Sequence, residues 1–196
     1  MTNAHRQLGK RGGWSGALLL GVCLSGSATT LAYEHRQDPG TLPEYVVKAG
    51  FLYNFAKYVE WPAEAFENAD APISIGIVGT DPFGEELDKA LRNKTVKGRP
   101  FTITRFREGN DPKGCHILFI PKTEKARTLD LLKQAESRPT LTVGEDEGFA
   151  GSGGMISILI EKEKPRLEVN PEAAERAKLG INSKLLKLAT IVRTAK

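Results

Sequence analysis

Histidine and cysteine are scarce in this chain, with three histidines and two cysteines among 196 residues. The sequence has no C-x-x-C and no H-E-x-x-H, which are spacings typical of zinc sites and metalloproteases. Cys115 and His116 are neighbours on an expected strand, so their side chains point to opposite faces and cannot form a thiolate–imidazole pair. We therefore expect no catalytic residue, no metal site and no cofactor, and an enzyme is the least favoured class of protein.

Both common phosphate-binding motifs are missing as well. The loop at residues 76–84 follows an expected strand and opens an expected helix, yet it contains neither G-x-G-x-x-G nor a Gly-Lys-Ser/Thr sequence. We interpret it as a tight turn in which Asp81 caps the helix. The glycine-rich stretch 148–154 is interpreted as a flexible connection, and the acidic residues 145–147 as a solvated loop rather than a cation site.

A strong excess of charge of one sign is absent from the main part of the chain. The formal net charge is +4, but Arg6, Lys10 and Arg11 lie within residues 1–32, which contain no acid. Residues 33–196 therefore carry 25 basic and 24 acidic side chains. Such a balance gives no electrostatic footprint for a phosphate backbone, so we expect no nucleic-acid partner.

The amino-terminal apolar run is too short to span a membrane. Residues 14–24 supply eleven positions, whereas a transmembrane helix needs about 20. The run follows a basic start and precedes the small residues 25–32, which is the three-part layout of a secretory signal peptide. We expect residues 1–32 to be cleaved, residues 33–43 to form an irregular lead-in, and residues 44–196 to form a single exported, periplasmic domain.

Cleavage of the signal would leave Cys115 as the one cysteine of the mature chain. An intrachain disulfide is then impossible, and a lone cysteine in an oxidising compartment is either buried or paired between chains. The run 115–120 is nearly continuous in apolar residues and ends at Pro121, as in a central strand buried on both faces. We favour a buried, unreactive Cys115 over a reactive thiol.

Strands and helices alternate along the rest of the chain. Short runs rich in Ile, Val and Phe predict strands, and apolar residues at i, i+3 and i+4 predict helices. Strands are expected at residues 73–78, 101–106, 115–120, 140–143, 155–160 and 166–170, and helices at 44–60, 81–92, 123–137, 171–178 and 183–193. The alternation favours an α/β fold in which a mixed sheet lies between helices in three layers, with an antiparallel carboxyl-terminal hairpin formed by the last two strands.

The first expected helix is rich in aromatic residues, with six between Tyr45 and Trp61. Phe51 and Phe55 share one helix face and are assigned to the core. Two interpretations of the other side chains stay open. The aromatics either cap the core with their polar edges in water, or join charged side chains in a surface that binds a partner or ligand. The candidate binding residues are Lys48, Asn54, Lys57, Glu60 and Trp61, together with Asn182 and Lys184 in the closing helical region.

Several sequence blocks resemble one known family. The first is VKAGFLYNFAKYVEWP at residues 47–62, and later ones are IVGTDPFG at 77–84, CHILFI at 115–120 and INSKLLKLA at 181–189. These blocks resemble the YfiR family of exported proteins, and the likeness covers essentially the whole mature chain. Members of the family carry pairs of cysteines, whereas the mature chain keeps only Cys115. The ligand-contacting Arg and His of the family have no secure counterpart in residues 179–184.

The resemblance implies a dimeric periplasmic α/β protein that represses an inner-membrane diguanylate cyclase and so lowers cyclic di-GMP, which controls biofilm formation. It also implies that a peptidoglycan-binding outer-membrane lipoprotein relieves the repression by sequestering the repressor. We therefore expect a non-catalytic regulator that binds the periplasmic domain of a membrane diguanylate cyclase. The alternative is a periplasmic small-molecule-binding sensor that acts on a histidine kinase, because related domains are fused to sensor kinases.

Overall fold

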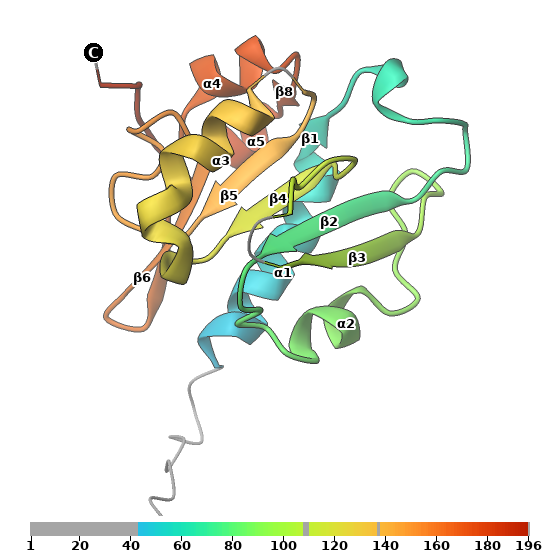
Figure 1. Cartoon of the computed structure of the whole chain (residues 1–196), viewed down its shortest axis with the longest axis horizontal. Coiled ribbons are helices and arrows are strands. Elements are labelled where there is room, and N and C mark those ends of the chain that lie inside the picture. The colour runs from blue at the N-terminus through green and yellow to red at the C-terminus, as the bar shows by residue number, and fades with distance from the viewer. Residues whose placement is uncertain (1–42, 108–109, 137, 196) are drawn as a thin grey trace, which may run out of the picture. The chain divides into compact units, whose positions relative to one another are not determined.

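A seven-stranded mixed sheet forms the centre of the structure (Figure 1). The structure is a computed structural model that describes residues 43–107, 110–136 and 138–195. The expected signal peptide and residues 33–42 of the expected lead-in lie outside these residues. Within the described part, none of the helices combines the length and apolar character needed to cross a membrane.

The sheet combines a parallel part with an antiparallel hairpin. Its strand order is β3-β2-β4-β5-β6-β7-β9, and every neighbouring pair from β3 to β6 is parallel. β6 pairs with β7 in antiparallel fashion, and β9 adds to β7 in parallel, so the expected α/β class with a carboxyl-terminal hairpin is confirmed. The strands are β2 (Ile73–Val78), β3 (Phe101–Phe106), β4 (Ile117–Ile120), β5 (Leu141–Gly144), β6 (Ile156–Glu161), β7 (Lys164–Val169) and β9 (Thr190–Ile191).

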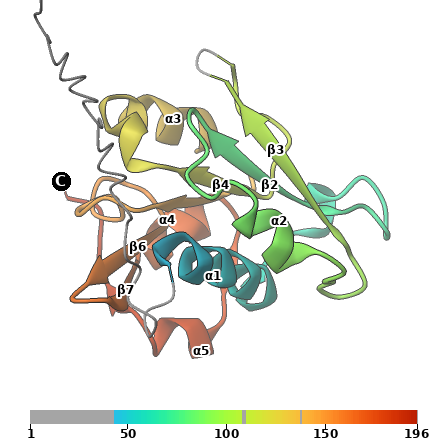
Figure 2. The same ribbon diagram turned by 90° about the horizontal axis from the view of Figure 1, so that it is seen from below.

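Helices cover both faces of this sheet, which confirms the three-layer arrangement (Figure 2). Side chains alternate between the faces along β4, so Ile117 and Phe119 join the larger core cluster while Leu118 and Ile120 join the smaller one. The larger cluster packs against α1 (Glu44–Tyr58), α2 (Glu86–Leu91), α4 (Pro171–Arg176) and α5 (Ser183–Leu186). The smaller cluster packs against α3 (Thr128–Ala135), and two 3₁₀ helices, η1 (Ala63–Ala65) and η2 (Lys122–Arg127), complete the helical segments.

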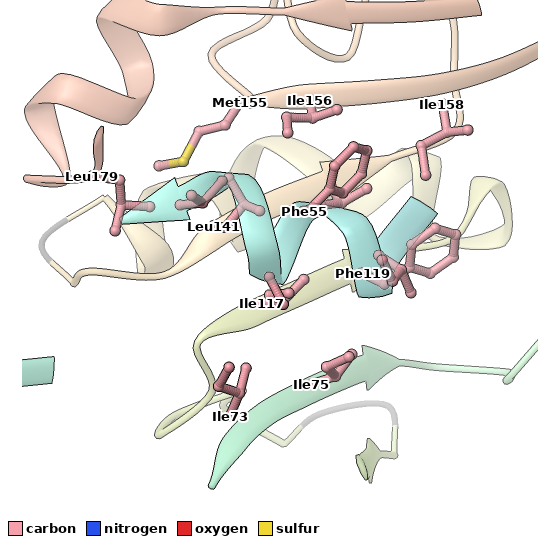
Figure 3. Close-up of a cluster of buried hydrophobic side chains, with 14 of the residues drawn as sticks. Phe55, Ile73, Ile75, Ile117, Phe119, Leu141, Met155, Ile156, Ile158 and Leu179 are labelled. Atoms are coloured by element: carbon pink, nitrogen blue, oxygen red, sulfur yellow. The ribbon is translucent and has the colours of Figure 1, made fainter. Parts of the chain in front are cut away.

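The two phenylalanines that the sequence assigned to the core differ in depth. Phe55 is 0% exposed and lies among side chains from β2, β4, β5 and β6 (Figure 3). Phe51 is half-buried and packs against the edge of the same cluster, with its ring centroid 6.0 Å from that of Phe55. Both rings therefore contribute to the core, but only Phe55 is fully enclosed.

All five expected helices are shorter in the structure, and three of them end or begin where other contacts take over. The first ends early because β1 (Val59–Glu60) pairs with β8 (Gly180–Ile181), and the last ends early because the chain rejoins the sheet as β9. Asp81 does not cap α2. Its carboxylate accepts a hydrogen bond of 2.8 Å from the backbone N–H of Phe83 within a turn, and α2 begins only at Glu86. Tertiary pairing and turn chemistry override the local helical pattern at these ends.

The glycine-rich stretch 148–154 folds around one buried ring, so the expected flexible connection is wrong. Phe149 is 3% exposed and belongs to the smaller core cluster. A Cβ on Gly144 would come within 2.4 Å of a ring carbon of Phe149, and one on Gly154 within 2.2 Å. These two positions need glycine because the ring occupies the space that a side chain would fill.

Candidate functional site

Two segments far apart in the sequence meet where α1 ends. β1 pairs with β8 so that Val59 lies opposite Ile181, and the backbone N–H of Asn182 donates to the carbonyl oxygen of Tyr58 over 2.8 Å. This pairing holds the carboxyl end of α1 beside the start of α5. Four exposed polar residues lie on or next to the paired segments and are called the β1–β8 surface: Lys57, Glu60, Asn182 and Lys184.

Local contacts hold two of the four side chains of the β1–β8 surface, those of Asn182 and Lys57. The side-chain oxygen of Asn182 accepts a hydrogen bond of 2.9 Å from the backbone N–H of Lys184, which caps α5. The ammonium of Lys57 lies 5.6 Å from the ring centroid of Tyr53 and 5.8 Å from that of Tyr58, within the range of cation–π attraction. The surface thus presents two lysines and one glutamate on a short, hydrogen-bonded scaffold.

Trp61 does not belong to this exposed group. Its indole N–H donates to the carbonyl oxygen of His116 over 3.2 Å, and its ring meets the His116 ring edge-on at 6.2 Å. The side chain is half-buried and packs against the larger core cluster. Trp61 therefore links the segment after β1 to the amino-terminal end of β4, and its removal should lower stability.

Both ring nitrogens of His116 make hydrogen bonds within the chain. Its Nε2 lies 3.0 Å from the carbonyl oxygen of Ala65, which can only accept, so this nitrogen carries the proton and Nδ1 accepts from the backbone N–H of Ser74 over 3.1 Å. The ring stacks on Phe66 at 4.3 Å. Burial lowers the pKa of His116, with a smaller contribution in the same direction from Arg99, which favours the neutral ring. These contacts give His116 a structural role at the start of β4.

Two adjoining pockets open at this amino-terminal edge of the strands. One has a volume of about 400 Å³ and the other about 270 Å³. They share Glu64, Ala65, Arg138 and Pro139 in their walls. The larger also reaches Cys115 and His116, and the smaller reaches Arg176 and Lys178. Sequence analysis missed the three cationic residues of these walls because they come from separate segments and show no common spacing.

Cys115 lies in the wall of the larger pocket yet is buried. It is 6% exposed, and its Sγ lies 3.7 Å from the carbonyl oxygen of Pro112. Burial raises the pKa of the Cys115 thiol to about 11, so the reactive thiolate is rare at neutral pH. The position and the pKa agree in describing an unreactive thiol.

We predict that native protein reacts with a thiol reagent at pH 8 about two orders of magnitude more slowly than a free thiol, since Cys115 is both enclosed and protonated. Labelling should be complete in denaturant, where the chain supplies the same cysteine without its enclosure. Stopped-flow absorbance with a chromogenic disulfide measures both rates. Rapid native labelling, or a dimer that disappears under reductant, would show instead that Cys115 is accessible.

Lys48 is buried, so it does not lie on the exposed surface of α1. It is 2% exposed, and its ammonium lies 2.5 Å from a carboxylate oxygen of Glu145, with a second ion pair to Glu44. The side chain of Glu145 is 0% exposed and accepts a backbone N–H from Lys122 over 2.8 Å. The expectation that Glu145 lies in a solvated loop is therefore wrong. The pair joins α1 to the carboxyl end of β5.

Tyr45 completes this buried cluster. Its hydroxyl donates to Glu145 over 3.4 Å, and its ring lies 4.8 Å from the ammonium of Lys48. Burial, reinforced by Glu145 and Glu44, raises the pKa of Tyr45 above its ordinary value, which keeps the phenol a hydrogen-bond donor. The remaining candidate, Asn54, lies half-buried on α1, one turn before Tyr58.

Comparison with known proteins gives one clear match. A family model described as YfiR/HmsC-like matches residues 45–190. The matched range starts one residue inside α1, ends at the first residue of β9, and includes the whole β1–β8 surface. It confirms the resemblance seen in the sequence blocks. No curated relative matches the chain.

Proposed function

The chain belongs to the YfiR/HmsC-like family, and we propose that it represses an inner-membrane diguanylate cyclase from the periplasm and so lowers cyclic di-GMP. In this proposal the protein is a non-catalytic homodimer that binds the periplasmic domain of the cyclase, and a peptidoglycan-binding outer-membrane lipoprotein relieves the repression. The family match carries the proposal, because it spans nearly the whole described domain and supports a periplasmic regulator of cyclic di-GMP signalling.

The β1–β8 surface is the docking site that we propose for the cyclase. Its side chains are exposed, and strand pairing fixes the backbone beneath them. A partner that binds this surface therefore loses little free energy to ordering the chain. Lys57 and Lys184 favour an acidic patch on the partner, since complementary charge raises the association rate and fixes the orientation of the complex. Asn182 supports this site mainly by capping α5.

We expect Lys184→Glu to weaken binding to the cyclase by about tenfold, because a like charge then faces an acidic partner. In cells that lack the native gene, this variant should leave cyclic di-GMP above the level restored by the wild-type protein. Its melting temperature should match that of wild type, since Lys184 is exposed.

Lys125→Glu is the matched control, because it makes the same charge change at an exposed residue of η2, which precedes α3. It should restore the wild-type level of cyclic di-GMP. Equal signalling by the Lys184 and Lys125 variants, at equal protein level, would place the docking surface elsewhere.

The two adjoining pockets favour a second candidate function, a sensor that binds a small molecule and acts on a histidine kinase. Together they offer apolar walls with cationic groups from Arg138, Arg176 and Lys178. The neighbouring genes separate the two candidates. A membrane cyclase with an OmpA-like lipoprotein beside the gene supports repression, and a kinase gene supports the sensor.

A further inference from the structure

β3 forms one edge of the seven-stranded sheet and lies beside α2 (Figure 1). It is six residues long, and among the described residues it pairs only with β2. The strand at the opposite edge, β9, has two residues. An edge strand presents unpaired backbone N–H and C=O groups to any strand that approaches it. β3 is therefore the longer of the two edges at which a further strand can extend the sheet.

The register between β3 and β2 fixes which backbone groups of β3 face outward. The carbonyl oxygen of Pro100, directly before β3, accepts a hydrogen bond of 2.8 Å from the backbone N–H of Ile73 in β2. Backbone groups alternate in direction along a parallel strand, so Phe101, Ile103 and Arg105 turn their N–H and C=O groups away from β2. None of these groups makes a hydrogen bond to a turn or loop within the described residues. The open side of β3 therefore offers the backbone groups of these residues to an added strand.

A groove lies beside this open edge, between β3 and the carboxyl end of α2, and is called the β3–α2 groove. Its volume is about 500 Å³, and its wall includes the apolar side chains of Leu91, Phe101 and Ile103. An added strand would lie about 4.8 Å from β3, with its side chains pointing alternately to the two faces of the sheet. Every second side chain would then point to the face on which α2 lies. The β3–α2 groove can accept these side chains, which is the arrangement by which extended peptides are bound through strand addition.

The charge of the β3–α2 groove favours an acidic peptide. Arg92 and Lys94 lie in its wall and are exposed, and neither belongs to an ion pair within the part of the chain that the structure describes. The acidic residue in the wall, Asp88, is paired with Arg105 over 2.6 Å. The two cations can therefore pair with carboxylates of a partner, whereas the charge of Asp88 is balanced within the chain. Complementary charge of this kind selects the partner and fixes its register.

We propose that β3 binds an extended acidic segment of a partner protein by strand addition. The backbone of this segment pairs with the open side of β3, and its alternate apolar side chains enter the β3–α2 groove. Its carboxylates lie at Arg92 and Lys94. The groove shares no residue with the β1–β8 surface, and the inference does not depend on the proposed function.

Peptides with selectively methylated backbones test this inference. The probe is a fluorescein-labelled peptide of sequence Asp-Val-Thr-Val-Thr-Val-Asp, and fluorescence anisotropy measures its binding to the exported chain. We expect a dissociation constant of about 100 µM or lower. Two further peptides carry N-methyl groups, one on the valines and the other on the threonines and the second aspartate. Only one of these sets of N–H groups faces β3 in a paired strand, so one methylated peptide should bind at least about tenfold more weakly than the other.

Lys94→Glu should weaken binding of the unmethylated peptide at least about tenfold, because a like charge then meets its carboxylates. Lys133→Glu is the matched control, since Lys133 is exposed on α3, on the other face of the sheet, and it should leave binding unchanged. No binding at about 1 mM peptide, equal binding of the two methylated peptides, or an equal loss in the two variants would each overturn the inference. Binding that falls as the protein concentration rises would show that a second copy of the chain occupies this edge, and would also overturn it.

Discussion

Lys48→Met is expected to destabilise the folded chain by about 3–5 kcal/mol, a large share of the 5–15 kcal/mol that holds a typical domain together. The substitution keeps most of the side-chain volume but removes the counter-charge of Glu145, whose carboxylate is 0% exposed. The backbone N–H of Lys122 and the hydroxyl of Tyr45 would be left to stabilise that charge. Urea denaturation followed by circular dichroism measures the loss.

The double variant Lys48→Met/Glu145→Leu is the control that separates charge from packing. Removing both members leaves no buried charge from the pair, so most of the lost stability should return. Glu145→Leu alone leaves Lys48 paired with Glu44, which is partly exposed, and should have an intermediate effect. If the two single effects simply add in the double variant, the ion pair is not what joins α1 to β5.

Phe55→Ala should destabilise the chain by about 3–5 kcal/mol, because a fully enclosed ring leaves a cavity between α1 and the sheet. Phe51→Ala should cost only about 1–2 kcal/mol, since its site is half open to water and can fill or collapse. Thermal and urea unfolding of the two variants measure the difference. Equal effects would show that the two rings are enclosed to the same depth in solution, against the structure described here.

Local sequence patterns predict six of the seven strands of the sheet, and its layers. The continuous apolar run at β4 predicts a strand that is covered on both faces, and the alternating isoleucines of β2 predict a strand. The turn after β6 follows from the strand patterns on its two sides. These features depend on residues within a few positions of one another. The periodicity of apolar residues along the sequence therefore predicts them well.

Features that join distant segments were not predictable in the same way. Lys48 and Glu145 are 97 residues apart in the sequence. Taken singly, a lysine or a glutamate predicts an exposed side chain. β1 and β8 have two residues each, too few for a strand pattern. The β1–β8 surface therefore forms only once the chain is folded, although the sequence predicts each of its four residues as a binding candidate. The contact between Trp61 and His116 also joins separate segments, so the sequence leaves open whether Trp61 packs on the core or lies on a binding surface.

Cyclic di-GMP in cells with and without the gene is the measurement that tests the central claim most directly. The account predicts that deletion raises cyclic di-GMP, that the wild-type gene supplied in trans restores the lower level, and that the rise disappears when the cyclase gene is also deleted. An unchanged or lower level of cyclic di-GMP after deletion would contradict the proposal that this protein represses a diguanylate cyclase.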